Sequence, residues 1–209
     1  MKTTILYFAL LIFLSITHVS TYAQESQTKD EIIKLIDAKV SLIEDFKKKN
    51  PKKLNIFNAI EKNDRSKLEE LPEMPEWVPD DSLFMVYILS DDKGRVLMHE
   101  VVPTSGSGDW TASYAHYFDD HGRTIMFEFY SGSFNSGCAD ILRITMRYYY
   151  DTNFKLAKKT VTYTDKNDKP IKNIERCDTY GIQRKEPKIY RAYKDIAAKI
   201  DKSQTPYIR

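Results

Sequence analysis

The sequence predicts an α+β fold, in which an antiparallel meander sheet of about seven strands carries a long N-terminal helix and a short C-terminal helix. Three observations indicate it. Residues 28–49 place apolar side chains at spacings of three and four, which is typical of an amphipathic helix. Residues 83–176 hold aromatic and β-branched runs separated by turn sequences, as hairpin-connected strands do. Residues 190–200 return to the helical spacing. A strongly curled sheet or an open barrel fits the same pattern.

The first 23 residues have the pattern of a secretory signal peptide. Lys2 precedes an apolar run of about 12 residues, which is shorter than the roughly 20 that a membrane span needs. Small residues then stand at Thr21 and Ala23, before Gln24. We therefore expect a periplasmic or secreted protein, made of a single α+β domain over residues 24–209 and without a membrane span after cleavage.

The charge distribution argues against a nucleic-acid partner. The chain has 32 Lys and Arg against 30 Asp and Glu, and both signs are interspersed along it. A nucleic-acid surface needs a basic stripe. The expected partner is instead an unidentified protein or a ligand of the cell envelope.

Residues 28–82 are expected to form a helical region followed by a Pro-rich connector. Thr28 and Glu31 have the spacing of a capping box at the start of the first helix. Its apolar stripe comprises Ile32, Ile36, Val40, Ile43 and Phe46, widened by Leu35 and Leu42. A second, weaker helical pattern spans residues 51–71. Three prolines then predict an extended connector, which Trp77 anchors to the core.

The predicted sheet spans residues 83–176, and its centre is a hairpin. Asp119 at the start of a turn and Gly122 at a position of positive φ are typical of a short hairpin loop. The seven predicted strands are 83–90, 95–102, 110–118, 123–130, 140–150, 155–164 and 170–176. A loop, the short helix and a frayed tail follow over residues 177–209.

The turn sequence of this hairpin recurs. Residues 91–95 repeat the form of residues 119–123, and residues 151–155 and 165–169 are looser copies, with Asn153 and Asn167 as the residues that tolerate a left-handed backbone. The frame, most clearly at residues 117–123, resembles the tyrosine-aspartate (YD, or Rhs-type) hairpin repeat. That resemblance implies a binding or shell-forming fold rather than an enzyme.

Two glycine- and serine-rich loops mark the predicted binding surface. A meander brings loops 103–109 and 131–139 to the same end of the sheet, and function favours such loops on a rigid scaffold. Phe134 lies inside the second loop and is either an exposed anchor or a plug for the core. The candidate binding residues are Trp110, Phe134, Asn135, His116 and Glu128.

Cys138 and Cys177 are the only cysteines, and a pair in an exported chain favours a disulfide. The predicted seventh strand opposes this pairing, because it would carry Cys177 to the opposite end of the sheet. Bridged Cα atoms lie within roughly 7 Å. Either Cys177 folds back, the last strand is wrongly predicted, or the two thiols are free.

Known catalytic and cofactor motifs do not occur in the sequence. The three histidines after the signal peptide have no zinc-binding spacing, and we find no P-loop, G-x-S-x-G or dinucleotide fingerprint. We therefore predict no cofactor and no metal. The expected function is a non-catalytic binding or interaction module of the bacterial cell envelope. The alternative is a hydrolase at the 103–110/131–139 edge that uses Asp109, Glu128 or His116.

Overall fold

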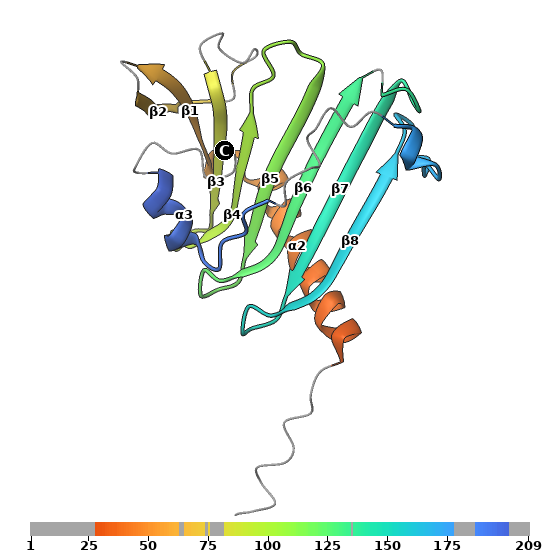
Figure 1. Cartoon of the computed structure of the whole chain (residues 1–209). Helices are drawn as coiled ribbons and strands as arrows, with labels where there is room; N and C mark the ends of the chain where they lie inside the picture. The colour runs from red at the N-terminus through yellow and green to blue at the C-terminus, as the bar shows by residue number, and fades with distance from the viewer. Residues whose placement is uncertain are drawn as a thin grey trace, which may run out of the picture.

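One antiparallel sheet organises the part of the chain that the structure describes. The computed structural model describes residues 28–62, 65–73, 75, 82–134, 136–177 and 187–200. Their eight strands are arranged in the order β2-β1-β3-β4-β5-β6-β7-β8, which confirms the predicted α+β meander (Figure 1). The sheet is not closed into a barrel, because β2 and β8 are not paired. The predictions for residues 1–23, Trp77, Asn135 and the C-terminal tail lie outside the described residues.

The strands follow one another along the sequence, so almost every neighbouring pair is a hairpin. Their bounds are β1 Leu54–Lys62, β2 Arg65–Leu71, β3 Ser82–Ser90, β4 Val96–Pro103, β5 Trp110–Phe118, β6 Thr124–Phe134, β7 Ile141–Tyr150 and β8 Leu156–Thr164. The helices are α2 Lys29–Lys49 and α3 Tyr193–Ile200, with 3₁₀ turns η1 Pro51–Lys53 and η2 Ile174–Arg176.

Helix α2 begins and packs as its sequence predicts. Thr28 and Glu31 form a reciprocal capping box, and three lysines occupy the last turn, where cations interact favourably with the helix dipole. One side of the helix is buried on the sheet through Ile33, Ile36 and Ile43. Leu35 and Leu42 do not belong to this stripe, because both side chains are exposed on the other side of the helix.

The predicted second helix over residues 51–71 is wrong. After the short turn η1, this region forms β1 and β2, and β1 lies between β2 and β3. Neighbouring residues such as Asn58 and Ala59 are buried on opposite faces of β1, as expected for a strand inside a sheet. Pairing with β3, which is distant in sequence, therefore overrides the weak local helical spacing.

Four turns of the meander have the same geometry. Each turn begins with an aspartate, which is Asp91, Asp119, Asp151 or Asp165. Its Oδ1 accepts the backbone N–H groups of the residues two and four positions later in the sequence. The fourth residue of each turn has positive φ. That residue is glycine in two turns but Phe154 and Asp168 in the others, so the predicted left-handed role of Asn153 and Asn167 is wrong.

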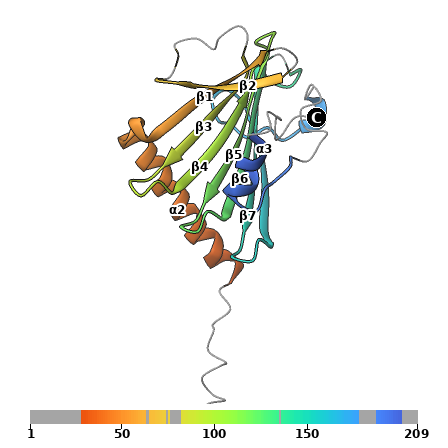
Figure 2. The same cartoon turned by 90° about the vertical axis from the view of Figure 1, so that its left-hand side faces the viewer.

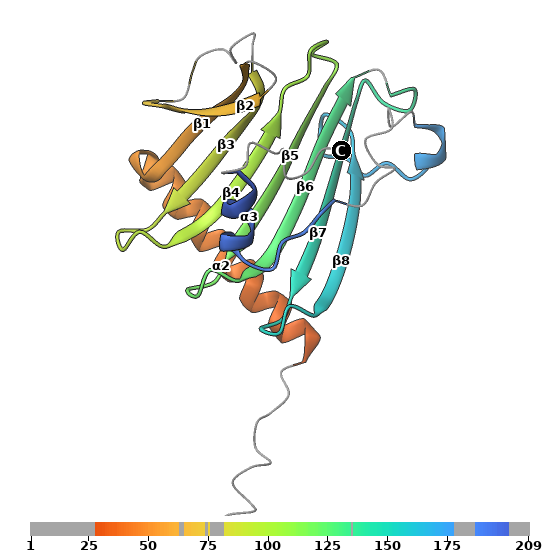
Figure 3. The same cartoon turned by 60° about the vertical axis from the view of Figure 1, so that its left-hand side comes forward.

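The C-terminal segment, residues 187–200, crosses the face of the sheet opposite to α2 (Figure 3). Thr124 fixes it twice, because its hydroxyl donates to the carbonyl of Tyr190 and its backbone N–H donates to that of Arg191. Helix α3 begins at Tyr193, so Tyr190 precedes the helix instead of belonging to it as the spacing predicts. The buried side chain of Ile196 then packs on Phe118 and Tyr190.

Candidate functional site

Residues 131–134, which the sequence predicts as loop, form the end of β6. Ser133 is paired with Trp110 of β5 and with Leu142 of β7, so this stretch is hydrogen-bonded on both sides. Gly132 allows a close approach there, since a Cβ atom on it would lie 3.1 Å from the methyl carbon of Thr111 and 3.3 Å from the Tyr130 hydroxyl. Small residues therefore allow close cross-strand packing here.

The two predicted loops do lie at one end of the sheet, and a backbone bond connects them. The N–H of Phe134 donates to the carbonyl of Asp109 at 3.0 Å. Within the first loop, the backbone N–H of Gly108, which has positive φ, donates to the Ser105 hydroxyl. The end of β6 is thus held in place by β5, β7 and the first loop together.

Phe134 is the large apolar side chain of this edge, with 47% of its surface exposed. The exposure rules out a plug for the core and fits the anchor that the sequence suggests. Phe134 is paired with Ile141 on β7, and the side chain of Arg143 lies on the same face of that strand. Sequence reasoning missed these two neighbours, because their positions depend on extending β6 to Phe134.

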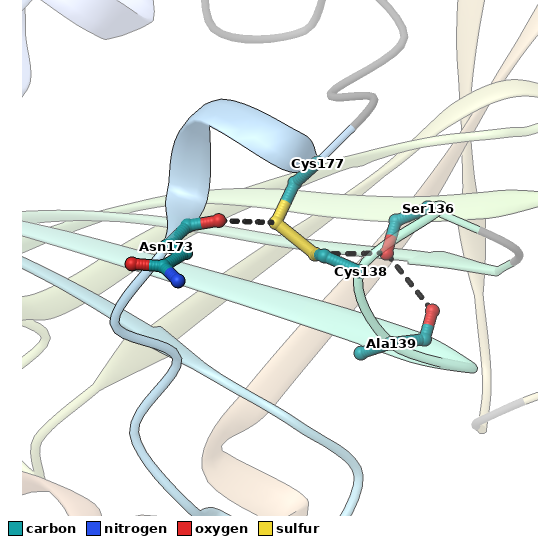
Figure 4. Close-up of a disulfide and its surroundings, with 5 residues drawn as sticks. All are labelled: Ser136, Cys138, Ala139, Asn173 and Cys177. Atoms are coloured by element: carbon teal, nitrogen blue, oxygen red, sulfur yellow. Dashed lines mark hydrogen bonds between the residues drawn. A yellow bond between two sulfur atoms is a disulfide. The ribbon is translucent and has the colours of Figure 1, made fainter.

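A disulfide between Cys138 and Cys177 braces the edge, with its Cα atoms 4.8 Å apart (Figure 4). The predicted strand 170–176, which argued against the bridge, does not form. Residues 174–176 make the turn η2 instead, so the chain remains at the end of the sheet where β8 finishes. The buried Ser136 hydroxyl donates to the carbonyl of Ala139 and lies 3.5 Å from the Cys138 sulfur.

Two ion pairs connect this edge to the turn after β8. Arg143 binds Asp168 at 2.7 Å, and Lys166 binds Asp140 at 3.0 Å. Both carboxylates are well exposed, so each pair contributes little to stability. Arg143 lies two residues after Ile141 on the same face of β7, so a charged group stands beside this apolar pair, as in the polar rim of an interface.

The remaining candidates do not join Phe134. Trp110 is paired with Ser133, so its side chain lies on the face opposite to Phe134. Glu128 is far down β6 and binds Arg147 at 2.6 Å. His116 is paired with Phe127, so it faces away from Glu128. Asp109, His116 and Glu128, the residues of the hydrolase alternative, therefore do not share one cleft.

His116 belongs instead to a buried pair with His99, its cross-strand neighbour. Nε2 of His116 accepts the backbone N–H of Tyr190 at 3.2 Å, whereas neither ring nitrogen of His99 has a hydrogen-bond partner among the residues that the structure describes. Burial lowers the pKa of His99 to about 3, and burial together with His99 lowers the pKa of His116 well below its usual value. Both rings are therefore neutral at physiological pH and closed off from solvent.

On the α2 face, one hydrogen bond and one ion pair join polar groups of the helix to the sheet. The Tyr117 hydroxyl donates to Glu44 at 2.9 Å, and Lys47 lies 3.5 Å from Glu100. Burial and the neighbouring Glu44 raise the pKa of Tyr117 far above its usual value. Across the described residues, no three His, Cys, Asp or Glu side chains are grouped closely enough to hold a metal ion. No helix in that part of the chain could span a membrane.

Comparisons with known proteins leave this geometry as the basis for a functional assignment. The chain matches no protein-family model, and it is not detectably similar to a curated protein or to a solved structure.

Proposed function

We propose that the protein is an exported, non-catalytic binding module of the bacterial cell envelope. Its binding surface is the Phe134 edge, which consists of Phe134, Ile141, Arg143 and the flanking loop residues 104–109 and 136–140. The observation that carries the proposal is an exposed phenylalanine on a backbone that is held by two strands, a loop hydrogen bond and a disulfide.

The rigidity of this edge supports a binding role. An exposed aromatic side chain is a common source of binding energy, and fixing its backbone beforehand lowers the entropy that is lost on association. A disulfide also favours an oxidising compartment, in keeping with the predicted signal peptide. The turn sequences also resemble those of YD-type hairpin repeats, which are binding or shell-forming folds.

Site-specific photo-crosslinking tests this function in a producing bacterium. We would replace Phe134 with a photoreactive phenylalanine analogue, and Leu156 in a parallel strain. Leu156 is the matched control because it is equally exposed, at 47%, but lies at the opposite end of the sheet. We expect a discrete crosslinked species from position 134 and none from position 156.

The crosslinked species also identifies the partner by mass spectrometry. Addition of Phe134→Ala protein, which lacks the proposed anchor, should fail to compete for it. Unmodified protein should compete. Crosslinks of equal yield from both positions, or none from position 134, would show that this edge is not the binding surface.

A further inference from the structure

Helix α2 lies on one face of the sheet (Figure 2), and two exposed leucines form a second apolar stripe along the helix. Its inner side already packs on the sheet through Ile33, Ile36 and Ile43. On its outer side, Leu35 is 57% exposed and Leu42 is 69% exposed, more than any other large apolar side chain among the described residues. They are seven residues apart, so they lie two turns apart on one side of the helix, as coiled-coil positions do.

Exposed charges flank this outer stripe in a polarised order. Lys34 stands beside Leu35, and Asp45 lies three residues after Leu42. Glu31 lies in the first turn and Lys49 is the last helical residue. Lys34, Asp45 and Lys49 form no ion pair within the part of the chain that the structure describes. The stripe is therefore both apolar and without an electrostatic partner.

A second copy of α2 fits this stripe only in the antiparallel direction. If Leu35 faces Leu42 of the second copy, the whole of α2 overlaps, because these leucines lie almost symmetrically about the middle of Lys29–Lys49. Lys34 then faces Asp45 of the second copy, and Glu31 faces its Lys49. Two-fold symmetry repeats each contact. In a parallel pair, by contrast, Lys34 of one copy and Asp45 of the other would be separated by eleven residues, or about 16 Å along the helix axis, so these contacts could not form.

We propose that two copies of this protein associate through the outer face of α2, as an antiparallel helix pair with Leu35 and Leu42 in its seam. The complementary charges select a second copy of the chain over an unrelated apolar partner. Each copy carries both the positive and the negative residues, so every contact between the copies joins opposite charges. The seam contains few apolar side chains, so the dimer should dissociate on dilution.

Charge-reversal variants test this arrangement by sedimentation equilibrium over a series of protein concentrations. Lys34→Glu places two carboxylates opposite each other at both ends of a homodimer, and Asp45→Lys places two lysines there. We expect each single variant to dimerise about tenfold more weakly than the wild type. The double variant, and an equimolar mixture of the two single variants, should restore the association because every contact again joins opposite charges.

Leu42→Glu supplies an independent test, because it places a charge in the seam itself. It should abolish the dimer, whereas the matched change Leu156→Glu should leave it intact. All these positions are exposed, and circular-dichroism melts verify that each variant folds. A monomeric wild type at every concentration, or a mixture of single variants that does not regain dimerisation, would overturn the proposal. Either result would leave the Phe134 edge untouched, since that edge contains no residue of α2.

Discussion

Two phenylalanines of β6, seven residues apart, have opposite surroundings. Phe127 is fully buried, and its ring contacts that of His116 with their centroids 4.7 Å apart. Phe134 is half exposed, although its backbone is paired with Ile141 of β7 and bonded to the carbonyl of Asp109. The comparison teaches that exposure here does not come from a backbone without hydrogen bonds. It comes from the position of Phe134 at the end of the sheet.

The two regions also differ in what holds them together. Phe127 belongs to a hydrophobic core cluster with Ala112, Phe129 and Tyr148, so burial of apolar surface is the main source of stability of this region. The Phe134 edge depends instead on a covalent bridge and on backbone hydrogen bonds. Such construction suits a surface that must keep its shape while exposing an apolar group to solvent.

The largest expected effect comes from Phe127→Ala. Removal of a fully buried ring leaves a cavity, so the free energy of unfolding should fall by about 3–5 kcal/mol. Urea denaturation followed by circular dichroism measures the loss. A loss below about 1 kcal/mol would mean that the surroundings of Phe127 and Phe134 do not differ as described.

Reduction of the disulfide should have the next largest effect, and it should act on the other region. The bridge closes a loop with a sequence separation of 39 residues, for which its removal costs about 2–4 kcal/mol. Thermal melts of oxidised protein, reduced protein and the Cys138→Ser/Cys177→Ser variant measure it. Identical melting temperatures would contradict the view that the bridge braces the Phe134 edge.

Mild acid should lower the free energy of unfolding through the buried histidines next to Phe127. His99 and His116 are neutral when folded, because burial lowers both pKa values, whereas their unfolded pKa is about 6.5. The unfolded chain therefore takes up protons first. The stability that the neutral rings provide is complete above pH 6.5 and is lost as the pH falls below it, by about 1.4 kcal/mol per histidine at pH 5.5.

Denaturation curves at pH 7.5 and pH 5.5 check the acid effect against a variant that cannot titrate in this range. In the double variant His99→Leu/His116→Gln, leucine replaces the buried His99 ring with an apolar side chain. The glutamine at position 116 can still accept the backbone N–H of Tyr190. We expect most of the pH dependence to disappear in this variant. An unchanged dependence would assign the acid sensitivity to other groups.

Local chemistry predicted most of the fold. The capping box defined the start of α2, and the Asp turns located the hairpins from β3 to β8, because these signals act within a few residues. Residues 51–71 were mispredicted because β1 is specified by pairing with distant strands. Leu35 and Leu42 were placed in the buried stripe because spacing alone does not reveal which side of a helix meets the sheet.

The candidate edge was predictable in part. Phe134 among Ser, Gly and Asn indicated an exposed aromatic, and its exposure bears out that reasoning. Its neighbours Ile141 and Arg143 depend on the exact register of β6 and β7, which the Gly/Ser composition concealed. Strand alternation, which was not applied across the hairpin, places His116 on the face opposite to Phe134. Glu128 shares the face of Phe134 but lies six residues away along β6.

The most direct test of the account is a pair of measurements on Phe134→Ala, with Leu156→Ala as the matched control. If Phe134 is an exposed anchor on a braced edge, the free energy of unfolding of the variant should lie within about 0.5 kcal/mol of the wild-type value, as for other exposed substitutions. The same variant should lose affinity at least tenfold for the partner identified by crosslinking from position 134, whereas Leu156→Ala should retain it. A loss of 3 kcal/mol or more in stability, or full retention of affinity, would contradict the assignment of the Phe134 edge as the binding surface.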